Sequence, residues 1–263
     1  MPMIARTEVI RSFARGLDVL RSFQDVRTQT ITDVAARTGI TRAAARRFLR
    51  TLCEQGLART DGKYFELTPS VLELGNAYVT AVAEFEHVRE LLHDLTRALG
   101  ESASAAVLDG SDVIYVARSP ARHRIMTISL AVGTRLPTHA TSMGQACLAT
   151  LSHNALERYF DTARLEALTA QTITSKAGLK ARLQLVAQRG YALVTGELET
   201  GLRSIAVAVC GPPTSPRLAL NVSAHAGNVD EAEMIARFLP ALQEAARQIN
   251  LAGLHPDVRA VAS

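Results

Sequence analysis

Arginines are concentrated in one short stretch of the chain, between Thr41 and Gln55. On a helix, their spacing places them on a single face, on an arc centred roughly 135° from the apolar residues of the same stretch. Guanidinium groups bind phosphate oxygens and the O6 and N7 edge of guanine, and a helix fits the major groove of B-DNA. The pattern predicts a recognition helix whose DNA-contacting residues are Thr41, Arg42, Ala43, Arg46, Arg47 and Arg50.

The other face of this helix is apolar, with Ala45, Phe48, Leu49 and Leu52 at helical spacing and Gly56 after its end. Such a helix can pack on its own domain while its basic face stays free. A solvated arginine face is the ordinary explanation of a charge run, and it would be preferred without further context. The neighbouring elements supply that context.

Two helices are expected before the arginine-rich one. Residues 9–23 carry one apolar stripe, formed by Val9, Phe13, Leu17, Leu20 and Phe23. A short helix then starts at Thr32, whose hydroxyl is a suitable N-cap, and ends at Gly39, which tolerates positive φ. Two helices joined by such a tight turn form a helix-turn-helix.

A β-hairpin is expected directly after the arginine-rich helix. Asp61-Gly62 lies between two short β-prone runs, residues 57–60 and 63–67, which is a strong hairpin signal. Arg59 and Lys63 flank its tip and could contact backbone phosphates. Three helices followed by a hairpin predict a winged helix-turn-helix.

The charge distribution agrees with a DNA-binding N-terminal module. Residues 1–80 contain 12 Lys or Arg and 8 Asp or Glu, a net charge of +4, whereas residues 81–263 contain 17 of each. A basic excess confined to one third of the chain suggests a polyanionic partner for that third, although a chance surplus would look the same. No apolar run is long enough for a membrane span, and no signal peptide is recognisable, so no membrane partner and a cytoplasmic location are expected.

The remaining sequence predicts a mixed helix and sheet domain. Thr68-Pro69 is a good helix start, and an apolar stripe then continues to Gly100, where it packs either on a partner chain or on its own domain. Beyond it, strands are expected at 103–108, 113–117, 125–132, 204–210 and 218–223. Helices are expected at 141–151, 155–160, 176–189 and 230–249. This order implies an antiparallel or mixed sheet covered by helices, an arrangement that often encloses a ligand cavity.

Catalytic and metal-binding motifs are not found. The sequence has no G-x-S-x-G, H-E-x-x-H, G-x-G-x-x-G or P-loop pattern, and its three cysteines are far apart. We therefore expect no enzyme, no cofactor, no catalytic residue and no metal site.

Four stretches together resemble the IclR family of bacterial regulators over nearly the whole chain, and most closely its PcaR/PcaU/PobR group. These stretches are Ile31–Ile40 with Ala44–Leu49, Gly133–Gly144, Gly190–Leu193 with Glu197–Glu199, and Gly201–Ala206.

The resemblance implies an α/β (α+β) protein with an N-terminal winged helix-turn-helix, a linker helix and a C-terminal GAF-like effector-binding domain. The expected boundaries are 1–68 for the DNA-binding domain, 69–83 for the linker helix, 84–252 for the effector domain and 253–263 for a tail. The expected partners are double-stranded promoter DNA with a palindromic site, a small aromatic or keto-acid effector, a second copy in a homodimer or dimer of dimers, and RNA polymerase if the protein activates.

The resemblance also places the effector between the sheet and the helix that follows the Thr-Ser-Met-Gly turn. Around it would lie Ile125, Ser142, Met143, Ser204, Asn221 and Ser223. A benzoate needs an apolar slot and a partner for its carboxylate. Met126 and Met143 could surround the ring, the helix starting at Ser142 favours an anion, and Arg124, Arg135 or His139 could supply charge.

The function expected from these features is a ligand-responsive regulator of aromatic-acid catabolism that senses 4-hydroxybenzoate or protocatechuate. Two alternatives remain open at this point. The C-terminal domain could serve only oligomerisation in a ligand-independent repressor, or it could be an enzyme domain fused to a DNA-binding module.

Overall fold

The computed structural model describes residues 9–24, 26–75, 84–121, 130–209 and 217–252. The chain forms two compact units, residues 1–78 and residues 79–263, which are considered separately below.

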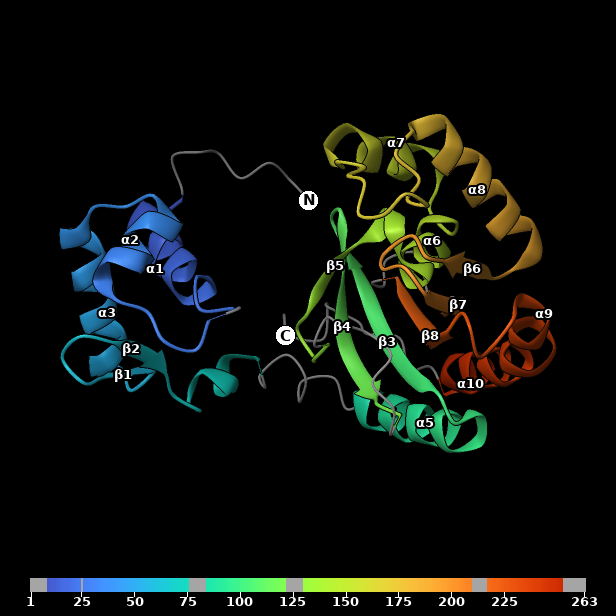
Figure 1. Ribbon diagram of the computed structural model, residues 1–263, viewed down its shortest axis with the longest axis horizontal. Coiled ribbons are helices and arrows are strands. Elements are labelled where there is room, and N and C mark those ends of the chain that lie inside the picture. The colour runs from blue at the N-terminus through green and yellow to red at the C-terminus, as the bar shows by residue number, and fades with distance from the viewer. Residues whose placement is uncertain (1–8, 25, 76–83, 122–129, 210–216, 253–263) are drawn as a thin grey trace. The chain divides into compact units, whose positions relative to one another are not determined.

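The N-terminal unit is a winged helix-turn-helix, as the sequence predicts (Figure 1). Val19, Val34 and Leu49 are completely buried at its centre, one from each helix. The elements are α1 (Arg11–Arg21), α2 (Ile31–Thr38), α3 (Arg42–Glu54), β1 (Ala58–Thr60) and β2 (Phe65–Leu67).

The N-cap of α2 differs from the prediction. The capping residue is Thr30, not Thr32, because the side chains of Thr30 and Asp33 each accept a hydrogen bond from the backbone N–H of the other residue. The Thr30 hydroxyl accepts from the Asp33 N–H at 3.3 Å, and the Asp33 carboxylate accepts from the Thr30 N–H at 2.8 Å. This reciprocal capping box places the N-cap two residues earlier than predicted. The hydrogen bonds from Thr30 also lower the pKa of Asp33.

The predicted stripe of α1 is wrong at its N-terminal end. Phe13 is 68% exposed and Val9 is also exposed, whereas Val19 and Phe23 are buried. Gly16 lies beside α3, since a Cβ added to it would be 3.8 Å from the Phe48 ring. Only the C-terminal half of α1 therefore packs against the other helices of this unit.

The hairpin closes through four residues, Asp61 to Tyr64, and not through the Asp-Gly pair alone. The Asp61 carboxylate accepts from the backbone N–H groups of Lys63 and Tyr64 at 2.9 and 2.7 Å, and Gly62 takes a φ of 100°. These hydrogen bonds lower the pKa of Asp61 and fix the tip of the wing.

Helical backbone follows the hairpin at residues 71–75, after a turn at Pro69 and Ser70. Residues 76–83 lie outside the described part of the chain, so the predicted linker helix and the predicted domain boundaries stay predictions. In this short helix Leu72 and Leu74 are exposed. The next helix, α5 (Glu84–Leu99), buries Val88, Leu92 and other residues of its stripe in the C-terminal unit itself.

The C-terminal unit is built on an antiparallel sheet. Its described strands follow the order β5-β4-β3-β8-β7-β6. They are β3 (Ser102–Asp109), β4 (Asp112–Ser119), β5 (Arg135–Pro137), β6 (Ala192–Thr195), β7 (Leu202–Val209) and β8 (Leu218–His225). The short helix η1 (Thr138–Ala140), α6 (Ser142–Leu148), α7 (His153–Thr162) and α8 (Lys176–Arg189) lie between β5 and β6. The C-terminal helical segments are α9 (Glu231–Glu233), η2 (Met234–Phe238) and α10 (Leu239–Leu251).

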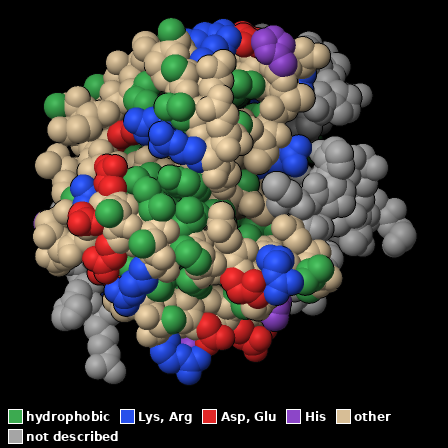
Figure 2. All heavy atoms as spheres, turned by 90° about the vertical axis from the view of Figure 1, so that its right-hand side faces the viewer, with side chains coloured by type: hydrophobic (Ala, Val, Ile, Leu, Met, Phe, Trp, Pro, Cys, Tyr) green, Lys and Arg blue, Asp and Glu red, His purple; other side chains and the backbone are tan. Residues whose placement is uncertain are grey.

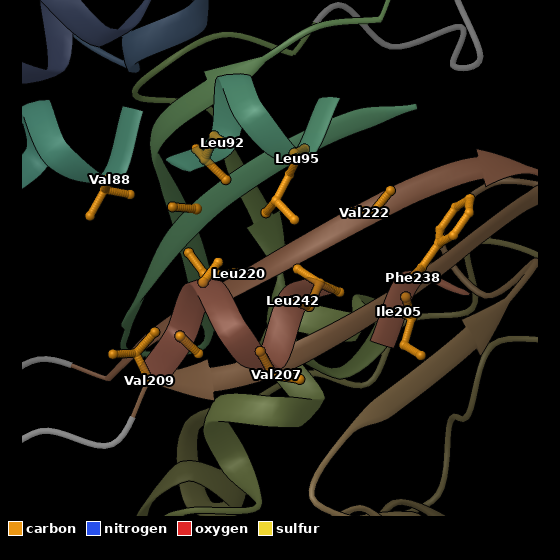
Figure 3. Packing of buried hydrophobic residues seen from close by; sticks show 14 of the residues in the cluster. Val88, Leu92, Leu95, Ile205, Val207, Val209, Leu220, Val222, Phe238 and Leu242 are labelled. Atoms are coloured by element: carbon orange, nitrogen blue, oxygen red, sulfur yellow. The ribbon is translucent and has the colours of Figure 1, made fainter. Parts of the chain in front are cut away.

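Successive side chains of each strand point to opposite faces of the sheet, and both faces are buried. One face carries Ile205, Val207, Leu220 and Val222 against α5, η2 and α10 (Figure 3). The other carries smaller residues such as Ala206 and Ala219 against α6. Because the second face is lined by small and polar side chains, it leaves room for a cavity.

The prediction for this unit requires correction in several places. The strands β5 and β6 were not predicted, because three or four residues give too little alternation to be recognised. Most of the predicted strand 125–132 lies outside the described residues, and residues 130–132 are not in a strand. The predicted helix 230–249 begins at the Asp230 cap as expected, but it contains the π-helical segment η2 before Pro240.

The surface of this unit has mixed charge on the face that Figure 2 shows. Lysine and arginine side chains are interspersed with aspartate and glutamate around a hydrophobic patch. This agrees with the equal numbers of both signs in residues 81–263. The surface in view offers no broad basic area of the kind that binds a polyanion.

Candidate DNA interface and effector cavity

The helix α3 presents its arginines to solvent. The Thr41 hydroxyl caps it by accepting from the Ala44 N–H at 3.2 Å, as predicted. All six predicted contact residues of this helix are exposed, whereas Ala45, Leu49 and Leu52 are buried. The helix therefore has one packed face and one free cationic face.

Arg42 is the most firmly positioned of these arginines. Its guanidinium donates to the Thr32 hydroxyl of α2 at 2.7 Å. Within the described residues, none of the four arginines of α3 forms an ion pair with an acidic side chain. Their charge is thus available to an external anion.

An open groove of about 800 Å³ separates α3 from the wing. Arg46 and Arg50 line it from the helix, and Thr60 and Gly62 line it from the hairpin. The basic helix face and the wing thus border the same concave surface.

The two predicted wing residues differ in their surroundings. Lys63 is exposed at the tip, with its ammonium 5.0 Å from the centre of the Tyr64 ring. Arg59 instead pairs with Glu66 on the neighbouring strand, which also lies 3.5 Å from Arg27. The charge of Arg59 is thus partly neutralised, so Lys63 is the better candidate for a phosphate contact.

A cavity lies in the C-terminal unit between the sheet and the start of α6. Its polar lining comes from Ser142, Ser204, Asn221 and Ser223, four of the predicted effector residues, together with Tyr115, Thr141 and Glu197. Its apolar lining comes from Ala140, Val194, Leu198 and Leu202. The predicted location between sheet and helix therefore coincides with a cavity, while the binding role of these residues stays a prediction.

The start of α6 is held by tight backbone packing. The Thr141 hydroxyl accepts from the Gly144 N–H at 3.1 Å and so caps the helix. Gly144 lies against the preceding η1, where an added Cβ would come within 2.1 Å of the Thr138 carbonyl oxygen. Only glycine permits this approach, which places Ser142 at the cavity wall.

Hydroxyl and amide groups line the sheet side of the cavity. The Ser204 hydroxyl donates to the Ser142 hydroxyl at 2.6 Å, and the Asn221 amide nitrogen donates to the Ser223 hydroxyl at 3.0 Å. The Asn221 side-chain oxygen is buried and has no hydrogen-bond partner. Such a group favours a ligand or water that completes its hydrogen bonding.

Glu197 brings a carboxylate to the cavity wall although it is only 3% exposed. Its two oxygens accept from the Arg182 guanidinium and the Gln145 amide, both at 2.9 Å. Burial raises the pKa of Glu197, while Arg182 and the hydrogen bonds oppose that shift. The group is therefore engaged with protein partners and does not present an isolated charge to a ligand.

The cavity has a volume of only about 10 Å³, room for a single water molecule. A cavity that accepts benzene is larger, on the order of 150 Å³. A ring-sized ligand would therefore require its walls to move apart.

The other predicted effector residues lie elsewhere. Met143 is completely buried in the core between α6 and the sheet, and His139 is buried with its Nε2 3.0 Å from the Glu166 carbonyl oxygen. Arg135 is at the surface, paired with Asp109 and Asp112. None of the three lines the cavity, and Ile125 and Met126 lie outside the described residues.

Sequence reasoning missed several residues that line this cavity. Tyr115 and Val194 reach it from the strands β4 and β6, and Glu197 reaches it from the turn after β6. Strand register determines which side chains share this face, and register was not available from the sequence. The Glu197–Glu199 stretch was recognised as part of the resemblance, which was the only signal for Glu197.

Comparison with protein families identifies the family to which both units belong. The helix-turn-helix domain of IclR matches residues 12–62, and the C-terminal domain of the bacterial transcriptional regulator IclR matches residues 76–251. The chain is a member of the IclR family. It is a DNA-binding transcriptional regulator, and its relatives are named as regulators and not as enzymes.

Several relatives are similar over nearly their whole length. The Pca regulon regulatory protein of Pseudomonas putida is 40% identical, with 92% of this chain and 84% of that protein covered. The p-hydroxybenzoate hydroxylase transcriptional activator of Acinetobacter baylyi is 35% identical, with 93% and 92% covered. A crystal structure of a transcriptional regulator from Rhodococcus sp. RHA1 is 40% identical with a TM-score of 0.80, covering 92% of this chain and 98% of that one.

The described residues contain no helix that is long and apolar enough to cross a membrane. In the same part of the chain, no group of three or more His, Cys, Asp or Glu side chains is arranged to hold a metal ion.

Proposed function

We propose that this IclR-family regulator senses a small aromatic carboxylate, such as 4-hydroxybenzoate or protocatechuate, and controls genes of aromatic-acid catabolism. The names of its relatives support this proposal, since they include a Pca regulon regulator and an activator of p-hydroxybenzoate hydroxylase. A double mutant of the PobR inducer-binding domain from Acinetobacter, solved in complex with 3-hydroxybenzoic acid, is 31% identical and covers 61% of this chain.

The observation that carries the proposal is the cavity between α6 and the sheet. It combines serine hydroxyls and the Asn221 amide with the apolar side chains of Val194, Leu198 and Leu202. A ring with polar substituents needs both kinds of surface. Because the cavity has room for only a water molecule, binding requires an expanded state, and a ligand that binds that state alone shifts the protein toward it.

On the DNA side, we propose that two copies of the chain place two α3 helices in successive major grooves of a palindromic promoter site. A homodimer or a dimer of dimers would meet this need, and RNA polymerase would be a further partner if the protein activates. The exposed arginines of α3 and Lys63 of the wing would make the contacts.

Calorimetric and thermal-shift titrations of the purified protein test the effector assignment. 4-Hydroxybenzoate and protocatechuate are expected to bind and to raise the melting temperature, because a ligand that binds only the folded state stabilises it. Hexanoate serves as an aliphatic control, and β-ketoadipate tests the keto-acid class. If no aromatic or keto acid binds, the ligand-independent repressor is favoured, whereas turnover of the acid would support a fused enzyme domain.

A further inference from the structure

We infer that Arg118 is the cation that binds the carboxylate of the effector, an inference that rests on the proposed function. The described residues that line the cavity include no arginine, lysine or histidine. A buried anion needs a charged or strongly hydrogen-bonding partner. Arg118 meets this need by its position in the sheet, its burial and the absence of an acidic partner among the described residues.

The register of the strands places Arg118 on the face of the cavity. Arg118 of β4 is directly opposite Ser104 of β3, and Ser104 is in turn opposite Asn221 of β8. Side chains directly opposite one another in antiparallel strands point to the same face. Arg118, Ser104 and Asn221 therefore form one row, and Asn221 at the end of that row lines the cavity.

Arg118 also lies near a second cavity residue. Tyr115, three residues earlier on β4, lines the cavity, and the positive charge of Arg118 opposes the rise in the pKa of Tyr115 that burial causes. Asn221 is two strands away from Arg118, about 9.6 Å at roughly 4.8 Å per strand, and the long arginine side chain can cover much of that distance. Expansion of the cavity toward β3 and β4 would therefore bring a ligand to this guanidinium.

The hydrogen bonding of Arg118 is incomplete. The side chain is half-buried, and its Nε is buried with no hydrogen-bond partner. Among the described residues, its Nη1 reaches the Leu130 carbonyl oxygen, at 3.5 Å. Within the described residues it forms no ion pair, and burial lowers its pKa. A partly desolvated guanidinium of this kind gains most from a carboxylate, which it can bind through two parallel hydrogen bonds.

The other described arginines near the cavity are already paired, and the predicted Arg124 lies outside the described residues. Arg182 is bound to Glu197, and Arg135 is bound to Asp109 and Asp112. With the carboxylate at Arg118, the ring would extend toward β7 and β6, where Ser204 and Glu197 can accept a hydrogen bond from a ring hydroxyl. The effector class that fits is an aromatic acid with a hydroxyl opposite its carboxylate.

The test compares 4-hydroxybenzoate with its neutral analogue 4-hydroxybenzamide by calorimetry on the full chain. Wild-type protein should bind the acid more tightly than the amide. Arg118→Gln should weaken binding of the acid by about 10- to 100-fold, as expected for loss of hydrogen bonds to a charged group, and should change binding of the amide by less than about twofold. Arg118→Lys should give an intermediate loss, because an ammonium keeps the charge without the two-pronged geometry.

Arg189→Gln, at an exposed arginine that does not line the cavity, is the matched control and should bind both ligands as the wild type does. If Arg118→Gln binds the acid normally, the inference is wrong while the proposed function stands. If the wild type binds neither ligand, the proposed function itself fails. If Arg118→Gln does not fold while Arg118→Lys binds the acid with wild-type affinity, Arg118 is a structural cation and the inference is also overturned.

Discussion

Single residues decide the geometry of both functional surfaces. At Gly144, the absence of a side chain lets α6 approach the Thr138 carbonyl oxygen and so sets the position of Ser142. At Arg42, one hydrogen bond to Thr32 fixes a guanidinium on the exposed face of α3. Both effects are local, and each can be tested with one substitution.

Gly144→Ala should destabilise the C-terminal unit by about 1–3 kcal/mol or more, because its methyl group would overlap backbone atoms that cannot rotate away. Thermal or urea unfolding measures this loss. Gly16→Ala is the control, since its added Cβ would lie 3.8 Å from the Phe48 ring, an ordinary van der Waals contact. Alanine is also a better helix former than glycine, so this variant should not be destabilised. Equal stability of Gly144→Ala and wild type would show that the close approach is not required.

Arg42→Ala should weaken binding to a selected duplex by about 10- to 100-fold while affecting random DNA less, because a positioned guanidinium can read a base edge. Lys63→Ala should weaken binding to both DNAs about equally and lower the salt dependence by roughly one charge. Fluorescence anisotropy with both duplexes at several salt concentrations separates these patterns. Equal losses for the two variants on both duplexes would contradict the assigned roles.

Elements with several agreeing local signals could be predicted from the sequence. For α3, the arginine face, the apolar face and the Thr41 cap all indicate one helix, and the structure has it. The strand β6 and the half of α1 that packs could not be predicted, because tertiary contacts select them. The same holds for the cavity: its place beside α6 followed from the resemblance, but Tyr115, Val194 and Glu197 required the strand register and the loop geometry.

The contact between α7 and α8 should depend on pH. Lys176 and Lys180 of α8 donate to Glu157 of α7 at 2.9 and 2.5 Å, and these hydrogen bonds lower the pKa of Glu157 to about 2. A carboxyl group whose pKa is lower in the folded state stabilises the fold above its ordinary pKa of about 4.3. That contribution is lost as the pH falls from there toward 2.

Glu157→Gln should therefore melt at a lower temperature than the wild type near pH 6, and the difference should disappear near pH 2. Calorimetric scans across this range measure it. High salt should reduce the difference at pH 6, since the pair is accessible to solvent. A difference that stays constant with pH would mean that the carboxylate charge is not involved.

At the scale of the whole molecule, the chain carries its DNA-binding surface and its cavity in separate units of different charge. The excess of positive charge is confined to residues 1–80, which contain the winged helix-turn-helix, while the unit with the cavity carries none. Regulation by an effector requires that the two sites be coupled through the free energy of the protein. Thermodynamic linkage then makes the coupling reciprocal, whatever structural path carries it.

Titration of 4-hydroxybenzoate into the protein, with and without a duplex selected for specific binding, measures this coupling directly. We expect the duplex to change the Kd of the ligand by about 5- to 150-fold, and saturating ligand to change the Kd of the duplex by the same factor. If each Kd is the same in the presence and absence of the other partner, the protein is not a ligand-responsive regulator of the kind proposed.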